Sequence, residues 1–224
     1  MNSGSAGPTA EPDGVRELLG LLAYASLTAF FRLADDAALA LALSDTTALA
    51  EMAVAEFRHY QLLRARLEEM PADPEAAMQP FVAAIDAFHA RTAPSDWLEG
   101  LVKAYVGDGI AADFYRAVAR VLEPRTRDLV LTVLADTGHA EFAIARVRAA
   151  IEADPRLAGR LALWARRLVG EALGQAQRVA AEREPLARLL AGGEPDQLGN
   201  IGRMFARLTD EHVARMSALG LASS

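Results

Sequence analysis

The chain has 224 residues, of which 52% are hydrophobic, a net charge of −7 and no cysteine. Its length allows one substantial core or two small ones. The absence of cysteine excludes disulfides, thiolate metal sites and iron–sulfur clusters. The negative charge gives no electrostatic signature for nucleic acid. Nearly all of the positive charge is arginine, and the cluster from Arg160 to Arg167 is interpreted as a solvated helix face.

The first 13 residues are small and polar and are interrupted by proline and glycine. We expect them to form a disordered leader, because they lack the basic start and apolar centre of a secretory signal. The longest apolar run, from Leu18 to Phe31, is too short to cross a bilayer. These features predict a cytoplasmic protein without membrane contact.

Helix-start signals divide the rest of the chain. Proline follows an acidic residue at 73–74, 123–124, 154–155 and 194–195, and the first turn of a helix tolerates proline. No segment has the pattern of a strand. The predicted all-α chain has helices at 14–41, 45–69, 74–91, 96–122, 124–152, 155–190 and 195–219. Because their connections are short, successive long helices should be antiparallel neighbours.

These helices pair into hairpins. The first two form one hairpin, those beginning at 96 and 124 form another, and the shorter segment 74–91 links them. This order is typical of a ferritin-like four-helix bundle with a crossover helix. The last two helices form an additional C-terminal hairpin. We therefore expect a single domain, 14–221, with the bundle in 14–152 and the extra hairpin in 155–219.

Two ionisable pairs interrupt the apolar helix faces. Glu56 and His59 lie on a stripe at helical spacing, where ionisable groups are costly to bury. Asp136 and His139 repeat the three-residue separation on the second helix of the other hairpin. In di-iron carboxylate bundles, two helices each give such a pair and the other two each give a carboxylate. One such pair alone would favour a buried hydrogen bond, but two favour metal ligands.

The missing carboxylates should lie on the preceding helices. Asp108, 28 residues before Asp136, occupies an apolar stripe at a suitable distance across the turn. The equivalent position in the first hairpin is Ser26, 30 residues before Glu56. A neutral hydroxyl thus stands where a carboxylate is expected. The predicted metal ligands are Glu56, His59, Asp108, Asp136 and His139.

Three segments, AEFRHYQLL, AYVGDGIAADFYRAV and LADTGHAEF, resemble the non-haem di-iron family of tRNA 2-methylthio-N6-isopentenyladenosine hydroxylase (MiaE), in its MiaE-like branch. The similarity runs from about Leu18 to Phe142, and in the branch to Leu221. It implies a di-iron cofactor and an O2-dependent monooxygenase or hydroxylase, an oxidoreductase.

The departures from the family pattern concern the ligands themselves. Asp replaces Glu at 108 and 136, which shortens each reach by one methylene, and Ser26 removes a negative charge. We therefore expect iron binding to be partial or mononuclear. Asp113 matches the acid that follows the family's carboxylate by five residues. It faces about 140° from Asp108 around the helix, so it should support the site without binding metal.

The substrate and the alternative function stay open at this stage. An acidic chain is poorly suited to hold tRNA through phosphate contacts, so a small apolar metabolite is at least as good a substrate as a modified tRNA nucleoside. The alternative is a metal-depleted helical interaction or oligomerisation protein derived from the same fold. A homodimer is compatible with either reading, whereas iron storage has no support.

Glu171 and His212 lie on apolar stripes at equal distances from the turn of the last hairpin. We expect them to face each other as a hydrogen-bonded pair. The alternative is that Glu171 supplies the carboxylate that position 26 lacks. His89 is predicted to be a surface or capping residue, and the four tyrosines are predicted to pack in the core with satisfied hydroxyls.

Overall fold

The computed structural model describes residues 12–71, 73–134, 139–191 and 197–221; the side chains of a few residues in these ranges, Asp108 and His139 among them, lie outside the description. The described residues form helices and no strand, which confirms the all-α prediction. The helices are α1 (Pro12–Leu39), α2 (Leu43–Glu68), α3 (Pro74–Arg91), α4 (Trp97–Ala119), α5 (Pro124–Val133), α6 (His139–Ala153), α7 (Leu157–Glu182), α8 (Glu184–Leu190) and α9 (Gln197–Ala218).

Most helix ends lie within three residues of the predicted ones, because the start signals act as expected. Asp73 accepts a hydrogen bond from the backbone N–H of Glu75, and Asp96 accepts one from that of Glu99. Pro74 begins α3 and Pro124 begins α5. Each of these residues satisfies or removes a donor that a helix start would leave unpaired.

Two predicted helices were wrong as continuous segments. The segment 124–152 is described as α5 and α6, and residues 135–138 between them lie outside the described residues. The segment 155–190 breaks at Arg183, whose φ of −121° and ψ of 81° are not helical. Pro185 explains this break, since it lacks an N–H and its ring would clash with the carbonyl of Ala181 in a continuous helix.

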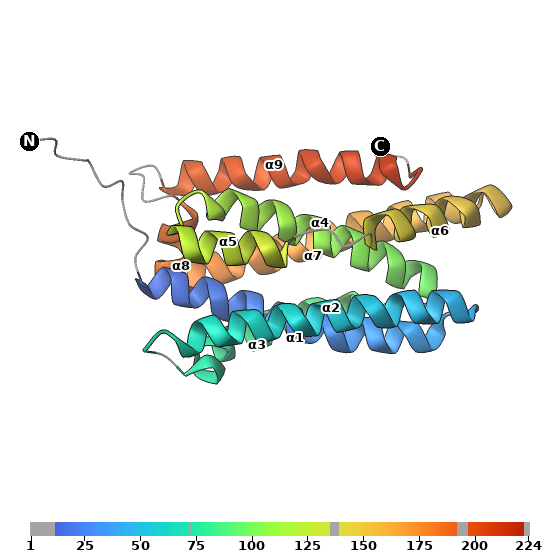
Figure 1. Cartoon of the computed structure of the whole chain (residues 1–224). Helices are drawn as coiled ribbons and strands as arrows, with labels where there is room; N and C mark the ends of the chain where they lie inside the picture. Colours follow the sequence, from blue (N-terminus) through green and yellow to red (C-terminus); the bar gives the residue numbers. More distant parts are fainter. Residues whose placement is uncertain (1–11, 72, 135–138, 192–196, 222–224) are drawn as a thin grey trace, which may run out of the picture.

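The helices form the two expected hairpins, and α3, which links them along the chain, lies beside α1 and α2 (Figure 1). α1 packs along α2 and also against α3, while α4 packs against α5 and α6. α7 and α9 pack on α4, and α8 packs on the start of α1. A methyl group on Gly20 would lie 2.1 Å from the carbonyl oxygen of Ala77, so only glycine allows the backbones of α1 and α3 to come this close.

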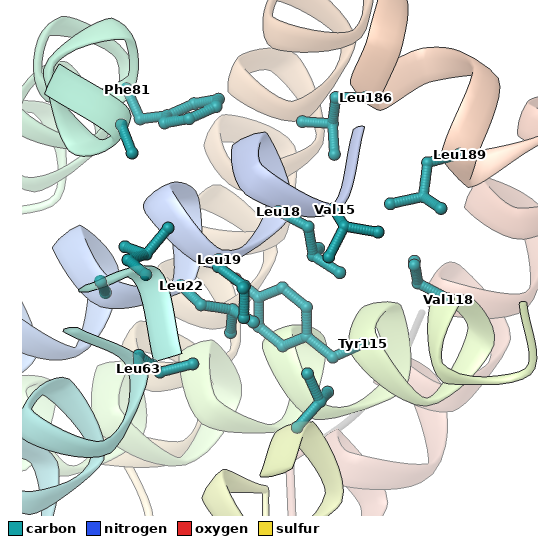
Figure 2. Packing of buried hydrophobic residues seen from close by; sticks show 14 of the residues in the cluster. Val15, Leu18, Leu19, Leu22, Leu63, Phe81, Tyr115, Val118, Leu186 and Leu189 are labelled. Atoms are coloured by element: carbon teal, nitrogen blue, oxygen red, sulfur yellow. The ribbon is translucent and has the colours of Figure 1, made fainter. Parts of the chain in front are cut away.

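Two apolar clusters hold the helices together. Figure 2 shows the first, in which Leu18, Leu19 and Leu22 of α1 meet side chains from α2, α3, α4 and α8. The second cluster joins α2, α4, α6 and α7 toward the opposite end of the molecule, around Leu101 and Leu161. Burial of each large side chain contributes roughly 1.5–3 kcal/mol, which makes these clusters the main source of stability.

One described helix, Asp13–Leu39, is long and apolar enough to cross a membrane by length and composition alone, with a mean hydropathy of 1.4. It lies near the N-terminus, and 44% of that window is buried inside the protein. Its packing against α2, α3 and α8 accounts for its apolar residues, since the first core cluster is built on this helix.

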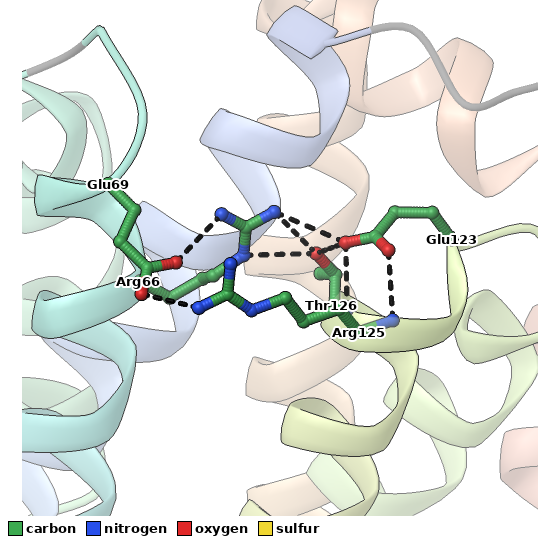
Figure 3. A network of polar contacts seen from close by, with 5 residues as sticks. All are labelled: Arg66, Glu69, Glu123, Arg125 and Thr126. Carbon is green, nitrogen blue, oxygen red and sulfur yellow. Dashed lines mark hydrogen bonds and ion pairs between the residues drawn. The ribbon is translucent and has the colours of Figure 1, made fainter.

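A polar network joins the end of α2 to the start of α5 (Figure 3). The Arg66 guanidinium donates to Thr126, Glu123 and Glu69 at 3.1–3.3 Å. The Glu123 carboxylate also accepts from the N–H groups of Arg125 and Thr126. The Thr126 hydroxyl, followed by these N–H groups and Arg66, lowers the pKa of Glu123 to about 2. The network holds the end of α2 against the start of α5.

Polar contacts also fix α7 on α4. The Trp164 indole N–H donates to the carbonyl oxygen of Glu99 at 2.9 Å. Arg160 forms ion pairs with Asp96 and Glu99, at 2.7 and 2.6 Å. Arg160, which belongs to the cluster from Arg160 to Arg167 interpreted above as a solvated helix face, is therefore engaged in ion pairs.

Candidate metal centre

A cavity of about 330 Å³ lies inside the bundle, between α1, α2, α4, α5 and α6, and α9 reaches into it. Polar groups from four helices line it among aliphatic side chains. They are Ser26, Glu56, His59, Tyr105, Asp113, Tyr115, Arg116, Glu211 and Arg215. A mixed polar and apolar lining inside a helical bundle is typical of a metal or ligand site.

Glu56 and His59 meet at this cavity. The Nδ1 atom of His59 lies 3.4 Å from Oε1 of Glu56, and the two side chains are 13% and 16% exposed, respectively. Nδ1 is buried and has no hydrogen-bond partner among the described residues. Buried polar atoms are usually satisfied, so an unpaired imidazole nitrogen beside a carboxylate is a donor pair that fits a metal ion.

Ser26 of α1 lines the same cavity and is buried, with 6% of its surface exposed. The position expected to be acidic therefore faces Glu56 and His59 across the hairpin. The acids nearest to it along the helix serve elsewhere. Glu17 forms an ion pair with Arg183 and accepts from the N–H of Leu186. The Asp36 carboxylate lies against Gly100 of α4, 2.9 Å from where a Cβ on that glycine would be.

The other three predicted ligands are placed only in part. Asp108 belongs to α4, one residue before Gly109 of the cavity wall, but its side chain lies outside the description. His139 begins α6, directly before Ala140 of the wall, and its side chain is also outside the description. Asp136 is outside the described residues altogether. The full ligand set therefore stays a prediction.

Asp113 lines the cavity and is bound by two arginines. Arg215 of α9 forms an ion pair with its carboxylate, with Nη1 at 2.9 Å from Oδ2, and Arg116 approaches Oδ1 at 3.2 Å. The Arg215 side chain is 10% exposed and crosses the helix surface at Gly109. A Cβ on Gly109 would lie 2.3 Å from its Nε atom. The glycine thus makes room for the guanidinium.

Sequence reasoning missed Arg215, which brings a positive charge into the cavity from a helix outside the bundle. The signals in the sequence were the glycine at 109 and an arginine on the buried face of the last helix, one turn after His212. Neither identifies a partner by itself, because the contact joins residues that are 102 positions apart.

Tyr115 forms another part of the cavity wall and is buried, with 6% exposure. Burial, reinforced by the negative charge of Glu56, raises the pKa of the Tyr115 phenol well above its ordinary value. The hydroxyl therefore keeps its proton at neutral pH. It can offer a hydrogen to a group in the cavity but does not act as a phenolate.

The expected pair between Glu171 and His212 was wrong. The Glu171 carboxylate pairs with Arg91 of α3 at 3.3 Å. His212 is buried, and neither ring nitrogen has a hydrogen-bond partner in the described part of the chain. Burial and the nearby charge of Arg215 lower its pKa, so the ring is neutral. Arg91 binds Glu171 more strongly than a neutral imidazole could, because Arg91 and Glu171 are both charged. Glu171 does not line the cavity that holds Glu56.

Residues 11–193 match a family model described as a ferritin-like domain of actinomycetes. The chain belongs to this ferritin-like family. The match spans α1 to α8 and confirms the ferritin-like fold predicted from the two hairpins, while the MiaE-like branch stays a prediction. Comparison with curated proteins gives no match. α9, which brings in Arg215, lies beyond the matched residues.

The described side chains fit one half of a metal site. Glu56 and His59 supply an oxygen and a nitrogen donor, a combination suited to iron. Among the described residues no group of three or more His, Asp or Glu side chains converges on one point. Asp108, Asp136 and His139, whose side chains lie outside the description, stay the predicted further ligands.

Proposed function

We propose that this ferritin-like protein binds iron in the bundle cavity and acts as an O2-dependent hydroxylase of the MiaE-like type. The observation that supports the metal site best is the buried Glu56–His59 pair, with its unpaired imidazole nitrogen. Asp108, Asp136 and His139 are the other proposed ligands. The sequence resemblance supports the hydroxylase class.

The chain's own residues would set up such a site as follows. Glu56 offers a carboxylate and neutral His59 offers a ring nitrogen to the same ion. Bound iron would supply the reduction of O2, as in other di-iron carboxylate proteins. Ser26 contributes no charge, so this side of the site binds a second ion weakly. The protonated Tyr115 hydroxyl offers a hydrogen-bond donor at the wall, and aliphatic side chains limit the access of water.

Two observations favour a small apolar substrate. Arg116 and Arg215 at the cavity and Arg160 of α7 are engaged in ion pairs, and the chain is acidic, which leaves little for phosphate contacts. A second, mainly apolar cavity of about 280 Å³ adjoins the first. Ala25 and Ala29 of α1 and Ala111 and Tyr115 of α4 line both cavities. We place the enzyme in the cytoplasm as part of the same proposal.

A second candidate function is a metal-depleted interaction or oligomerisation protein derived from this fold. The Arg215 guanidinium favours it, because a fixed positive charge in the cavity repels a metal cation. The empty carboxylate position at Ser26 acts in the same direction. In this reading the Asp113–Arg215 pair replaces the charge balance that a metal would provide.

Iron content separates the two functions. The protein, purified aerobically with iron supplied, is compared by elemental analysis with Glu56→Gln and His59→Gln variants. Glu171→Gln is the matched control, since it removes a carboxylate paired outside the cavity. We expect up to about one iron per chain in the parent and the control. Loss of a ligand should lower iron affinity at least about tenfold, so the two cavity variants should contain little or no iron. A metal-free parent, or variants that retain its iron, would refute the proposed centre.

A further inference from the structure

The apolar cavity beside the candidate metal centre is elongated along the helices. Its lining on α1 runs from Leu21 to Asp36, and on α4 from Lys103 to Tyr115. At 1.5 Å per residue these stretches are about 18–22 Å long. Leu186 and Leu190 of α8 lie among the lining residues at the apolar end.

The opposite end of the cavity is charged. Lys103, the only lysine, is 8% exposed and donates to the carbonyl oxygen of Thr92 at 2.7 Å. Its ammonium lies 5.5 Å from the centre of the Phe88 ring. Arg32 and Asp36 line the same end from α1, and His89 lines it from α3. The three charged residues of the lining and its histidine therefore gather where α1 and α3 end and α4 begins.

The charges of the lining residues at this end do not cancel one another. Burial lowers the pKa of Lys103 to about 8, and Asp36 partly opposes that effect. Burial, with the charges of Lys103 and Arg32, lowers the pKa of His89 to about 3. At neutral pH the lining thus holds two positive groups, one carboxylate and a neutral imidazole. The lining therefore carries a surplus of positive charge, of which Lys103 is the buried part. Arg32 is 54% exposed and also pairs, at 3.9 Å, with Asp35, which lies outside the lining.

Two polar atoms in the lining lack partners. Oε1 of Gln175, a residue with 7% exposure on α7, is buried and has no hydrogen-bond partner in the described part of the chain. The same holds for Nδ1 of His89. Leaving such atoms unsatisfied costs roughly 1–3 kcal/mol each, so a polar group that bonded to them in this mainly apolar cavity would be favoured.

We propose that this cavity binds an amphipathic carboxylic acid, with its carboxylate at Lys103 and Arg32 and its hydrocarbon chain along α1, α4 and α7. The length and apolar lining match an extended chain, and the surplus positive charge matches a single carboxylate. The chain would pass the wall formed by Ala25, Ala29 and Ala111, which separates it from the candidate metal centre. Binding does not need the metal; that the bound acid is the substrate rests on the proposed function.

Calorimetric titration of the metal-free protein at pH 7 tests the binding site by itself. The probes are dodecanoate, dodecan-1-ol and dodecyltrimethylammonium, which share a chain and differ in head-group charge. We expect dodecanoate to bind at least about tenfold more tightly than the alcohol, as a charge-assisted hydrogen bond would give, and the cation to bind most weakly. Equal affinity for dodecanoate and the alcohol, or preference for the cation, would overturn the proposal.

Variants locate the site. Lys103→Met removes the charge at nearly constant volume and should abolish the preference for dodecanoate over the alcohol, while Lys103→Arg should retain it. Ala176→Phe fills the cavity from α7 and should weaken both probes; circular dichroism confirms that it is folded. Glu171→Gln, outside the lining, is the control. Unchanged dodecanoate binding in both Lys103→Met and a folded Ala176→Phe would place the ligand elsewhere and refute the assignment. Iron content plays no part in these outcomes.

Discussion

Replacement of Gly109 by alanine tests whether Arg215 really occupies the bundle cavity. The new methyl carbon would lie 2.3 Å from Nε and 2.4 Å from Cδ of Arg215, so the guanidinium must leave its position. Loss of a buried ion-pair partner costs about 3–5 kcal/mol. Asp113 is 21% exposed and keeps Arg116, which reduces that cost. Alanine recovers about 1 kcal/mol of helix propensity. The net expectation is a loss of about 1–3 kcal/mol.

Thermal unfolding followed by circular dichroism measures this loss. For a chain of this size, 1 kcal/mol corresponds to about 2–4 °C in Tm. Gly107→Ala is the matched control, because it lies in the same helix and a Cβ there meets nothing within 4 Å. We expect the control to gain up to about 1 kcal/mol from helix propensity. If Gly109→Ala proved as stable as Gly107→Ala, the position assigned to the Arg215 side chain in the cavity would be wrong.

Three further predictions concern other parts of the molecule. Gly20→Ala should destabilise the protein by about 3 kcal/mol in urea unfolding, because its methyl meets the backbone carbonyl of Ala77, whereas Gly159→Ala on an open face should not. The pKa of His89 lies far below that of an unfolded histidine, so stability present above pH 6.5 should fall as the pH drops toward 3, by up to about 1.4 kcal/mol per pH unit. His89→Gln should flatten that slope in acid titrations, and an unchanged slope would contradict the burial of the ring. Ser26→Glu should raise iron content toward two per chain, and an unchanged count beside the parent would show that position 26 does not serve the metal.

Local signals in the sequence were enough to place most of the helices. The Asp-Pro and Glu-Pro pairs mark helix starts through interactions that span a few residues, so α3 begins and ends where predicted. The same logic, applied to Glu184-Pro185, would have ended α7 where the structure ends it. The apolar stripe of α7 is followed directly by that of α8, so the hydrophobic pattern continues across the end of α7 and does not indicate it.

The candidate site was predictable only where its residues repeat a pattern. Glu56 and His59 were found from their spacing on one apolar face, and the structure places both at one cavity. Arg215 could not be found in this way, since an arginine on an amphipathic helix usually lies at the surface. Lys103 and His89 were missed for the same reason: burial of a charged end depends on which helices meet there, and no local pattern records it.

The short helix α8 has a consequence for the motions of the protein. With seven residues, it is too short to be stable alone. It is held by Leu186, which is fully buried, and by the Glu17 carboxylate, which accepts from the Leu186 N–H at 3.1 Å. The amide hydrogens of α8 and of the first turns of α1 should therefore exchange with solvent together, as one cooperative unit. Because Leu186 and Leu190 of α8 line the apolar end of the cavity, opening of this unit would also expose that end to solvent.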